Sequence, residues 1–358
     1  MADNKDKKVL NVPHLRFPEF SGEWEKKRFK DVCNITTGNK NTQDKSDDGI
    51  YPFYVRSQNV ERINSWTFDG EAILTAGDGV GVGKVFHYST GKIGVHQRVY
   101  ILSDFKCDGK YLYSYFAGNF YNRVKRMSAK NSVDSVRMEM IADMPISLPS
   151  TMEQKKIGHL LALLDERIAT QNKIIEKLES LIKGIAHRVA GMGKPNVRIA
   201  ECLECTSSTL QESEVSDLGT YPVYGANGIV GFLDSYNTPD KAIYIVKDGS
   251  GVGSVAYVKG KCSATGTLNI LTAKQDYSLQ FLYYLLKVFN FEPYKTGMAI
   301  PHIYFKDYGK AKIFCSSYSK QLRYAKMLEA IDAKLLIEQK ILISLNSQKQ
   351  YLLRQMFI

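Results

Sequence analysis

Residues 154–189 read QKKIGHLLALLDERIATQNKIIEKLESLIKGIAHRV. The apolar residues in this stretch recur at alternating intervals of four and three. This is the heptad pattern of a helix that packs against a second helix along a narrow seam. An ordinary buried helix is the alternative, but its apolar stripe would be wider. The pattern therefore predicts one long helix, with a seam formed by Ile157, Leu161, Leu164, Ile168, Gln171, Ile175, Leu178 and Ile182.

A second seam lies near the end of the sequence. Its members are Leu328, Ile331, Leu335, Glu338, Leu342, Leu345 and Leu352. Glu338 takes the place that Gln171 takes in the first seam, and a polar residue at a seam position specifies register at a cost in stability. Two seams in one chain most simply pack on each other. The spacing alone leaves the parallel and the antiparallel arrangement open.

The sequence that precedes each helix is also duplicated. YPFY begins at Tyr51 and YPVY at Tyr221, whereas DGVGVG begins at Asp78 and DGSGVG at Asp248. The pair YLYSYF and FLYYLL follows in the same order and at the same separation. Three matching blocks at one separation are hard to obtain by chance, so we interpret the chain as one unit repeated twice.

Each half begins with short runs of valine, isoleucine and tyrosine that are separated by glycine, which is typical of short strands joined by turns. A helix is expected near residues 109–127 and another near residues 278–290. The predicted fold class is α+β, with two pseudo-symmetric strand-rich domains joined by the two long helices. The expected boundaries are residues 1–150 for the first domain, 151–191 for the first helix, 192–318 for the second domain and 319–358 for the last helix.

Composition narrows the class of protein. The net charge of +11 favours an anionic partner, and nucleic acid is the commonest one. The sequence has neither an apolar run long enough to span a membrane nor the apolar core of a signal peptide, so we expect a cytoplasmic protein. Of the six cysteines, only Cys202 and Cys205 are spaced like metal ligands. A zinc site needs about four ligands, so reduced thiols and no metal are expected.

The glycine-rich stretch GDGVGVGK, from Gly77 to Lys84, raises the question of phosphate binding. A nucleotide-binding P-loop requires glycine where Asp78 stands and serine or threonine where Val85 stands. A dinucleotide-binding loop opens a helix, whereas here the strand-like KVFHY follows. The stretch therefore indicates a tight hairpin. The six histidines show no metal-ligand spacing either, so the sequence predicts no catalytic site.

A protein that reads DNA needs lysine or arginine for phosphates and polar side chains that reach base edges. Loops of both halves carry such clusters, although a solvated surface role is the alternative for any single residue. The candidate DNA-binding residues are Lys40, Arg56, Gln58, Lys84, His96, Gln97, Arg98, Lys130, Asn131, Asn227, Lys247, Thr265, Lys295, His302 and Tyr304. Because His96-Gln97 lies opposite Thr265-Gly266 in the repeat, the halves are expected to read different sequences.

Several stretches resemble a known family. The opening NVPHLRFPEFSGEWEKKRFKDVC, the glycine-rich GDGVGVGKVFHYSTGKIGVHQRVYIL and the helical MPISLPSTMEQKKIGHLLALLDERIATQ are similar to type I restriction–modification specificity subunits. The second half repeats this layout with weaker echoes, such as DGSGVGSVAYV. It departs from the layout at FCSSYSKQ, where Lys320 stands in place of Glu153.

The resemblance implies that each strand-rich domain is a target recognition domain and that the long helices form an antiparallel coiled coil, which spaces the domains. It implies a subunit that reads a two-part target in double-stranded DNA across an unspecified gap. Two methyltransferase (M) subunits would dock on the helices and methylate adenine, and restriction (R) subunits would add translocation and cleavage. S-adenosylmethionine, ATP and magnesium would belong to these partners, so the chain would be non-catalytic and hold no cofactor.

Two other classes of protein stay open at this point. One is a coiled-coil scaffold that pairs proteins and reads no DNA. The other is a stand-alone modification enzyme, against which the missing cofactor motifs argue.

Overall fold

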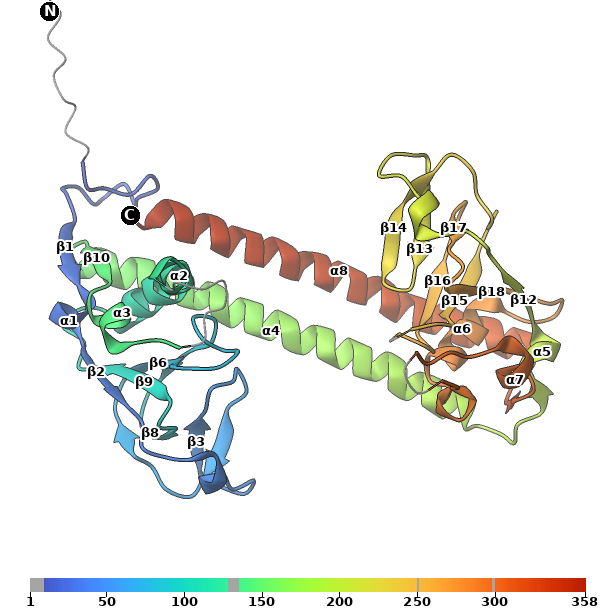
Figure 1. Cartoon of the computed structure of the whole chain (residues 1–358), viewed down its shortest axis with the longest axis horizontal. Coiled ribbons are helices and arrows are strands. Elements are labelled where there is room, and N and C mark those ends of the chain that lie inside the picture. The colour runs from blue at the N-terminus through green and yellow to red at the C-terminus, as the bar shows by residue number, and fades with distance from the viewer. Residues whose placement is uncertain (1–9, 128–134, 250, 298–299) are drawn as a thin grey trace, which may run out of the picture. The chain divides into compact units, whose positions relative to one another are not determined.

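The computed structural model describes residues 10–127, 135–249, 251–297 and 300–358. The chain forms two compact units (Figure 1). Unit 1 comprises Met1–Gln171 and Ile341–Ile358, and unit 2 comprises Asn172–Lys340. The long helices α4 (Thr151–Ala190) and α8 (Tyr318–Met356) each contribute residues to both units.

Unit 1 is built on two four-stranded sheets and a two-stranded ribbon. The first sheet has the order β2 (Asn34–Thr37), β9 (Val99–Ser103), β6 (Ala72–Ala76) and β7 (Phe86–Ser89). The second has the order β4 (Glu61–Ile63), β3 (Tyr51–Tyr54), β8 (Lys92–Val95) and β5 (Phe68–Asp69). The ribbon pairs β1 (Glu25–Arg28) with β10 (Pro145–Leu148). The β6–β7 pair is antiparallel and the glycine-rich stretch connects it, so the hairpin is confirmed, but residues 77–85 lie between the strands and the turn is not the tight one expected.

Three helices complete unit 1: α1 (Phe29–Val32), α2 (Gly109–Met127) and α3 (Met138–Ala142). The span of α2 confirms the helix expected at residues 109–127. Its buried face carries Phe116 and Phe120, whose rings stack with centroids 4.5 Å apart. The ring centroid of Phe116 also lies 5.3 Å from that of Phe29 in α1. Large aromatic side chains that leave water together supply much of the stabilisation of a core.

Unit 2 repeats this layout strand by strand. Its main sheet has the order β12 (Leu203–Ser207), β18 (Leu268–Ala273), β15 (Ala242–Val246) and β16 (Val255–Val258). Its second sheet has the order β14 (Gly228–Leu233), β13 (Tyr221–Gly225) and β17 (Ser263–Ala264), and β11 (Val197–Arg198) pairs with β19 (Lys312–Ile313). Its short helices are α5 (Ile199–Cys202), α6 (Leu279–Lys287) and α7 (Phe305–Tyr308). The place of β5 is taken in unit 2 by an isolated antiparallel bridge between Thr238 and Cys262.

The long helices pack together within each unit. In unit 1, Asp165 of α4 pairs with Lys349 of α8. In unit 2, Ile182 of α4 packs in one cluster with Leu328 and Leu335 of α8. The start of α4 therefore meets the end of α8, and the end of α4 meets the start of α8. This order makes the pair antiparallel, the arrangement that the resemblance implied.

The predicted seam positions can be located on these helices. Each one is buried or half-buried, whereas most of the positions between them are exposed. The polar members Gln171 and Glu338 are only 7% and 8% exposed. The α+β fold with two strand-rich units and two packed long helices is confirmed.

One glutamine in each repeat fastens a long helix to its own unit. In unit 1, the Asp108 amide donates to Gln154 Oε1 at 3.0 Å, and Gln154 Nε2 donates to the Pro149 carbonyl at 2.8 Å. In unit 2, Gln321 makes the same two bonds, with the Ser278 amide and the Ser316 carbonyl, at 2.9 Å each. Both glutamines are buried, so each one satisfies a donor and an acceptor that have left water.

Replacing either glutamine by alanine is expected to lower the free energy of unfolding of its unit by about 1–3 kcal/mol, because buried backbone groups lose their partners. Urea unfolding followed by circular dichroism measures the change. Gln348→Ala, on an exposed position of α8, is the control, and its effect should stay within about 0.5 kcal/mol. A Gln154→Ala effect as small as the control's would show that the side chain does not fasten the helix.

Candidate nucleic-acid interface

Four loops of unit 1 meet at one edge, and they carry most of the residues that the sequence singled out. The Gln97 amide donates to the Lys40 carbonyl at 2.8 Å, which joins the loop after β8 to the loop after β2. The His96 amide donates to the carbonyl of Tyr54, the last residue of β3. The Gly77 amide donates to the Arg98 carbonyl at 2.8 Å, which brings in the glycine-rich loop. Backbone hydrogen bonds thus join segments that are far apart in the sequence.

A carboxylate stands between two arginines at this edge. Arg56 Nη1 lies 2.7 Å from Asp78 Oδ1, and Arg98 Nη1 lies 3.4 Å from Asp78 Oδ2. The side chains of Arg56 and Arg98 are 46% and 63% exposed, and that of Asp78 is 23% exposed. Both guanidinium groups therefore present donors to solvent while one anion holds them.

His96 lies beneath these arginines and is only 5% exposed. The Arg98 amide donates to His96 Nδ1 at 3.0 Å, so the ring proton stands on Nε2, which lies 3.3 Å from Thr42 Oγ1. A histidine in this tautomer donates to Thr42 and cannot take its proton. The pair is therefore a structural contact and not a nucleophile with its base.

The charge state of His96 follows from the same surroundings. Burial, and after it the positive charge of Arg56, lowers the pKa of His96 below its ordinary value. Burial also lowers the pKa of His87, which contacts the Ser57 carbonyl. Both rings stay neutral in the folded protein at pH values where an unfolded chain already binds protons.

Unit 1 is therefore expected to lose stability as the pH falls below about 6.5, the ordinary histidine pKa, because the unfolded chain takes up protons that the folded state refuses. The stability that is lost at low pH is fully retained above about pH 6.5, where the histidines are neutral in both the folded and the unfolded chain. Urea midpoints at about pH 7.5 and 5.5 measure the loss, and His96→Asn should reduce it. His159→Asn, on an exposed position of α4, should leave it unchanged. An equal pH dependence in His96→Asn and wild type would contradict this explanation.

A hollow of about 570 Å³ opens beside Arg56, and its lining also includes Thr42, Val80 and His96. Val80 is 97% exposed, which is unusual for an apolar side chain. Such a residue at a loop tip suits contact with a thymine methyl group or insertion at a base step.

The remaining candidates of unit 1 are placed separately. Lys84 lies over the ring of Tyr121, 5.6 Å from its centroid. Gln58 is exposed and lines a second hollow together with His87. Lys130 and Asn131 lie outside the described residues.

Unit 2 has the same backbone frame. The Thr265 amide donates to the carbonyl of Tyr224 in β13, and the Lys247 amide donates to the Thr267 carbonyl at 2.9 Å. In unit 1 the matching hydrogen bonds run from the His96 amide to the Tyr54 carbonyl and from the Gly77 amide to the Arg98 carbonyl. Thr265 therefore corresponds to His96, and Thr267 to Arg98. Thr265 is buried, and its hydroxyl lies 2.8 Å from that of Thr267. His96 and Thr265 therefore both sit beneath their edge and support it.

The other unit 2 candidates surround this edge. Asn227 is exposed at the turn between β13 and β14. His302 bridges to Asp248 of the second glycine-rich loop, and its ring lies 5.1 Å from that of Tyr304, which is 47% exposed. Lys295 pairs with Glu292.

The sequence did not single out Asp78, Thr42 or Val80. Asp78 carried a usable signal, because an aspartate recurs as Asp248 in the second copy of the loop. A hairpin position by itself indicates no contact with a distant arginine. Thr42 and Val80 carry no pattern, because their importance depends on which loops meet in space.

The described residues contain no group of three or more histidine, cysteine or acidic side chains that could hold a metal ion. Burial raises the pKa of Cys205 to about 11, which disfavours the thiolate that metals require. No described helix is long and apolar enough to cross a membrane.

Comparisons with known proteins agree with the repeat. The model of the type I restriction modification DNA specificity domain matches the chain twice, over residues 21–180 and 196–347. The EcoDI specificity subunit of Escherichia coli is 27% identical over 45% of this chain, a stretch that spans 35% of the relative's length. A putative type I specificity subunit of Mycoplasma pneumoniae is 24% identical over 66% of this chain and 68% of its own length.

A solved structure shows that the fold is shared. The crystal structure of a type I restriction-modification S subunit from M. genitalium aligns over 97% of this chain and 99% of its own, with a TM-score of 0.74 and 18% identity. Two copies of the matched domain cover most of the sequence. The chain belongs to the family of type I restriction–modification specificity subunits.

Proposed function

We propose that this specificity subunit reads a two-part target in double-stranded DNA, with one part read by each unit. The observation that carries the proposal is that one backbone frame occurs twice and holds different side chains at corresponding edge positions. Arg98 in unit 1 is replaced by Thr267 in unit 2, within matching hydrogen bonds. A constant frame with variable polar side chains suits readers of different base edges.

The subunit itself performs no chemistry in this proposal. The one histidine–hydroxyl contact at the edge has the wrong tautomer for a base, and the nucleotide-loop patterns are absent from the sequence. Two methyltransferase subunits dock on the long helices and methylate adenine with S-adenosylmethionine. Restriction subunits supply cleavage with ATP and magnesium, and the assembly acts in the cytoplasm.

Methyl transfer by reconstituted mixtures tests this assignment. The chain together with the modification subunits should methylate adenine in DNA with S-adenosylmethionine, whereas either component alone should give no sequence-specific methylation. Methylation by the purified chain alone would make it a stand-alone enzyme. Methylation by the modification subunits without the chain, at the same sites, would reduce it to a scaffold.

A further inference from the structure

We propose that Asp78 holds Arg56 and Arg98 as a fork that reads guanine in the part of the target assigned to unit 1, and that Ala226 and Thr267, at the corresponding positions of unit 2, form no such fork. The inference rests on the proposed function and deepens it, because it names the base that one edge recognises. Both guanidinium groups contact the Asp78 carboxylate, that of Arg56 at 2.7 Å and that of Arg98 at 3.4 Å.

The arginines are held in place from more than one side. The Arg98 carbonyl accepts from the Gly77 amide, next to Asp78, and the Arg98 amide donates to the buried His96 ring. Gly81 packs so closely against the Arg56 carbonyl that an added Cβ would lie 2.5 Å from its oxygen. The glycine-rich loop can therefore approach the backbone of Arg56 only because it carries no side chain there.

The carboxylate also distinguishes base reading from phosphate binding. A phosphate contact needs positive charge and little fixed direction, and a neighbouring anion weakens it. Reading guanine requires donors aimed at O6 and N7, and a guanidinium fixed beforehand loses less freedom on binding. Asp78 cancels part of the positive charge of the arginines while it fixes the direction of their N–H donors. This combination favours recognition of a base edge over phosphate binding.

The corresponding positions of unit 2 carry different chemistry. Tyr54 and Tyr224 correspond, so Ala226 stands where Arg56 stands, and Thr267 stands where Arg98 stands. The aspartate is kept as Asp248. Without the two arginines, these two positions offer a methyl and a hydroxyl group, which suit an A·T pair as well as a G·C pair.

The test uses the chain assembled with its modification subunits and maps methylated adenines by sequencing. Arg56→Lys and Arg98→Lys keep the charge but lose the fork. Each should reduce discrimination about 10- to 100-fold at a G·C pair in one part of the motif and leave the other part unchanged. Thr267→Ala is the position-matched control, and it should change only the other part. The unchanged part also shows that each variant folds and assembles.

Asp78→Asn separates the fork from a simple positive patch. It should reduce discrimination at the same G·C pairs while strengthening binding to unrelated DNA, because one negative charge is removed. If the lysine variants still discriminated fully at every G·C pair, the arginines would contact phosphates and the inference would be overturned. Relaxed discrimination at an A·T pair, or unaltered discrimination in Asp78→Asn, would overturn it as well. Failure of the proposed function would be seen separately, as a wild-type complex that methylates no two-part motif.

Discussion

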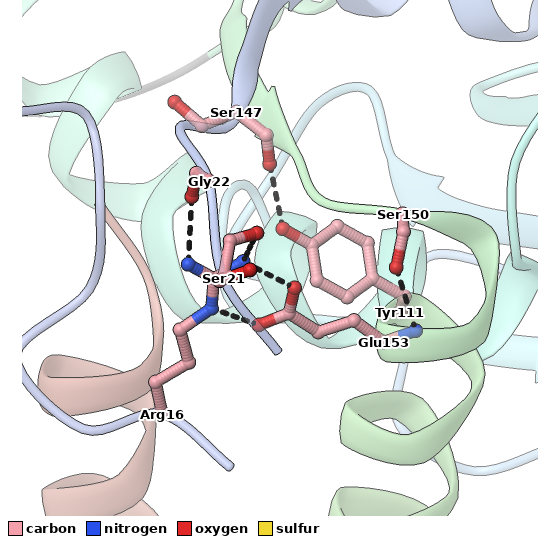
Figure 2. A network of polar contacts seen from close by, with 7 residues as sticks. All are labelled: Arg16, Ser21, Gly22, Tyr111, Ser147, Ser150 and Glu153. Atoms are coloured by element: carbon pink, nitrogen blue, oxygen red, sulfur yellow. Dashed lines mark hydrogen bonds and ion pairs between the residues drawn. The ribbon is translucent and has the colours of Figure 1, made fainter. Parts of the chain in front are cut away.

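Replacement of Arg16 by alanine is expected to lower the free energy of unfolding of unit 1 by about 3 kcal/mol, because it leaves a buried carboxylate without its partner. Glu153 is 1% exposed, and both of its oxygens accept from Arg16, at 2.7 Å and 2.8 Å (Figure 2). Arg16 also donates to the carbonyls of Ser21 and Gly22, so it anchors the N-terminal segment. The hydrogen bond to Glu153 raises the pKa of Arg16.

Tryptophan fluorescence during urea unfolding measures this change selectively, because the only two tryptophans, Trp24 and Trp66, both lie in unit 1. A matched control lies on the same helix and in the same unit. Lys155 is exposed on α4, so Lys155→Ala should change stability by less than about 0.5 kcal/mol. If Arg16→Ala were no more damaging than Lys155→Ala, the ion pair would not fasten the segment to α4.

Replacement of Phe357 by alanine should destabilise unit 1 by about 3–5 kcal/mol, the usual loss for a phenylalanine removed from a core. Its ring lies 5.2 Å from that of Tyr111 and 5.4 Å from that of Tyr115. Tyr111 in turn contacts Trp24, at 6.2 Å. Phe357 and its neighbour Met356 thus complete a core whose other buried members come from the first half of the sequence.

The same fluorescence experiment tests this prediction. Ile358→Ala is the control, since Ile358 is 45% exposed and its loss should leave the urea midpoint nearly unchanged. An equal, small effect of both substitutions would mean that the end of α8 only rests on unit 1.

Periodic features of the fold could be predicted from the sequence. The heptad spacing identified both long helices, and α4 ends at Ala190, next to the expected residue 191. The repeat indicated two equivalent units, because a duplicated sequence folds twice in the same way. Direction could not be obtained from the spacing, since a heptad pattern reads equally in parallel and antiparallel pairs. It depends on contacts such as that of Asp165 with Lys349.

Contacts across long sequence separations escaped prediction for a different reason. Arg56, Asp78 and Arg98 lie in three loops, and nothing local in the sequence joins them. The loops meet because β3 lies beside β8 in one sheet and β6 lies beside β9 in the other, and the loop that carries Arg98 connects β8 to β9. The ion pair of Arg16 with Glu153 likewise depends on where the N-terminal segment packs. The sequence can therefore indicate contact residues only by chemical type, and two of the candidates, His96 and Thr265, lie beneath their edges.

The proposed function requires that the two units read two separate parts of one DNA target. The decisive measurement is a map of every methylated adenine in a host that carries this chain and its modification subunits. We expect a motif of two specified parts separated by a fixed number of unspecified bases, with variants of unit 1 and unit 2 changing different parts. A continuous motif, or a single part that changes with variants of both units, would contradict it.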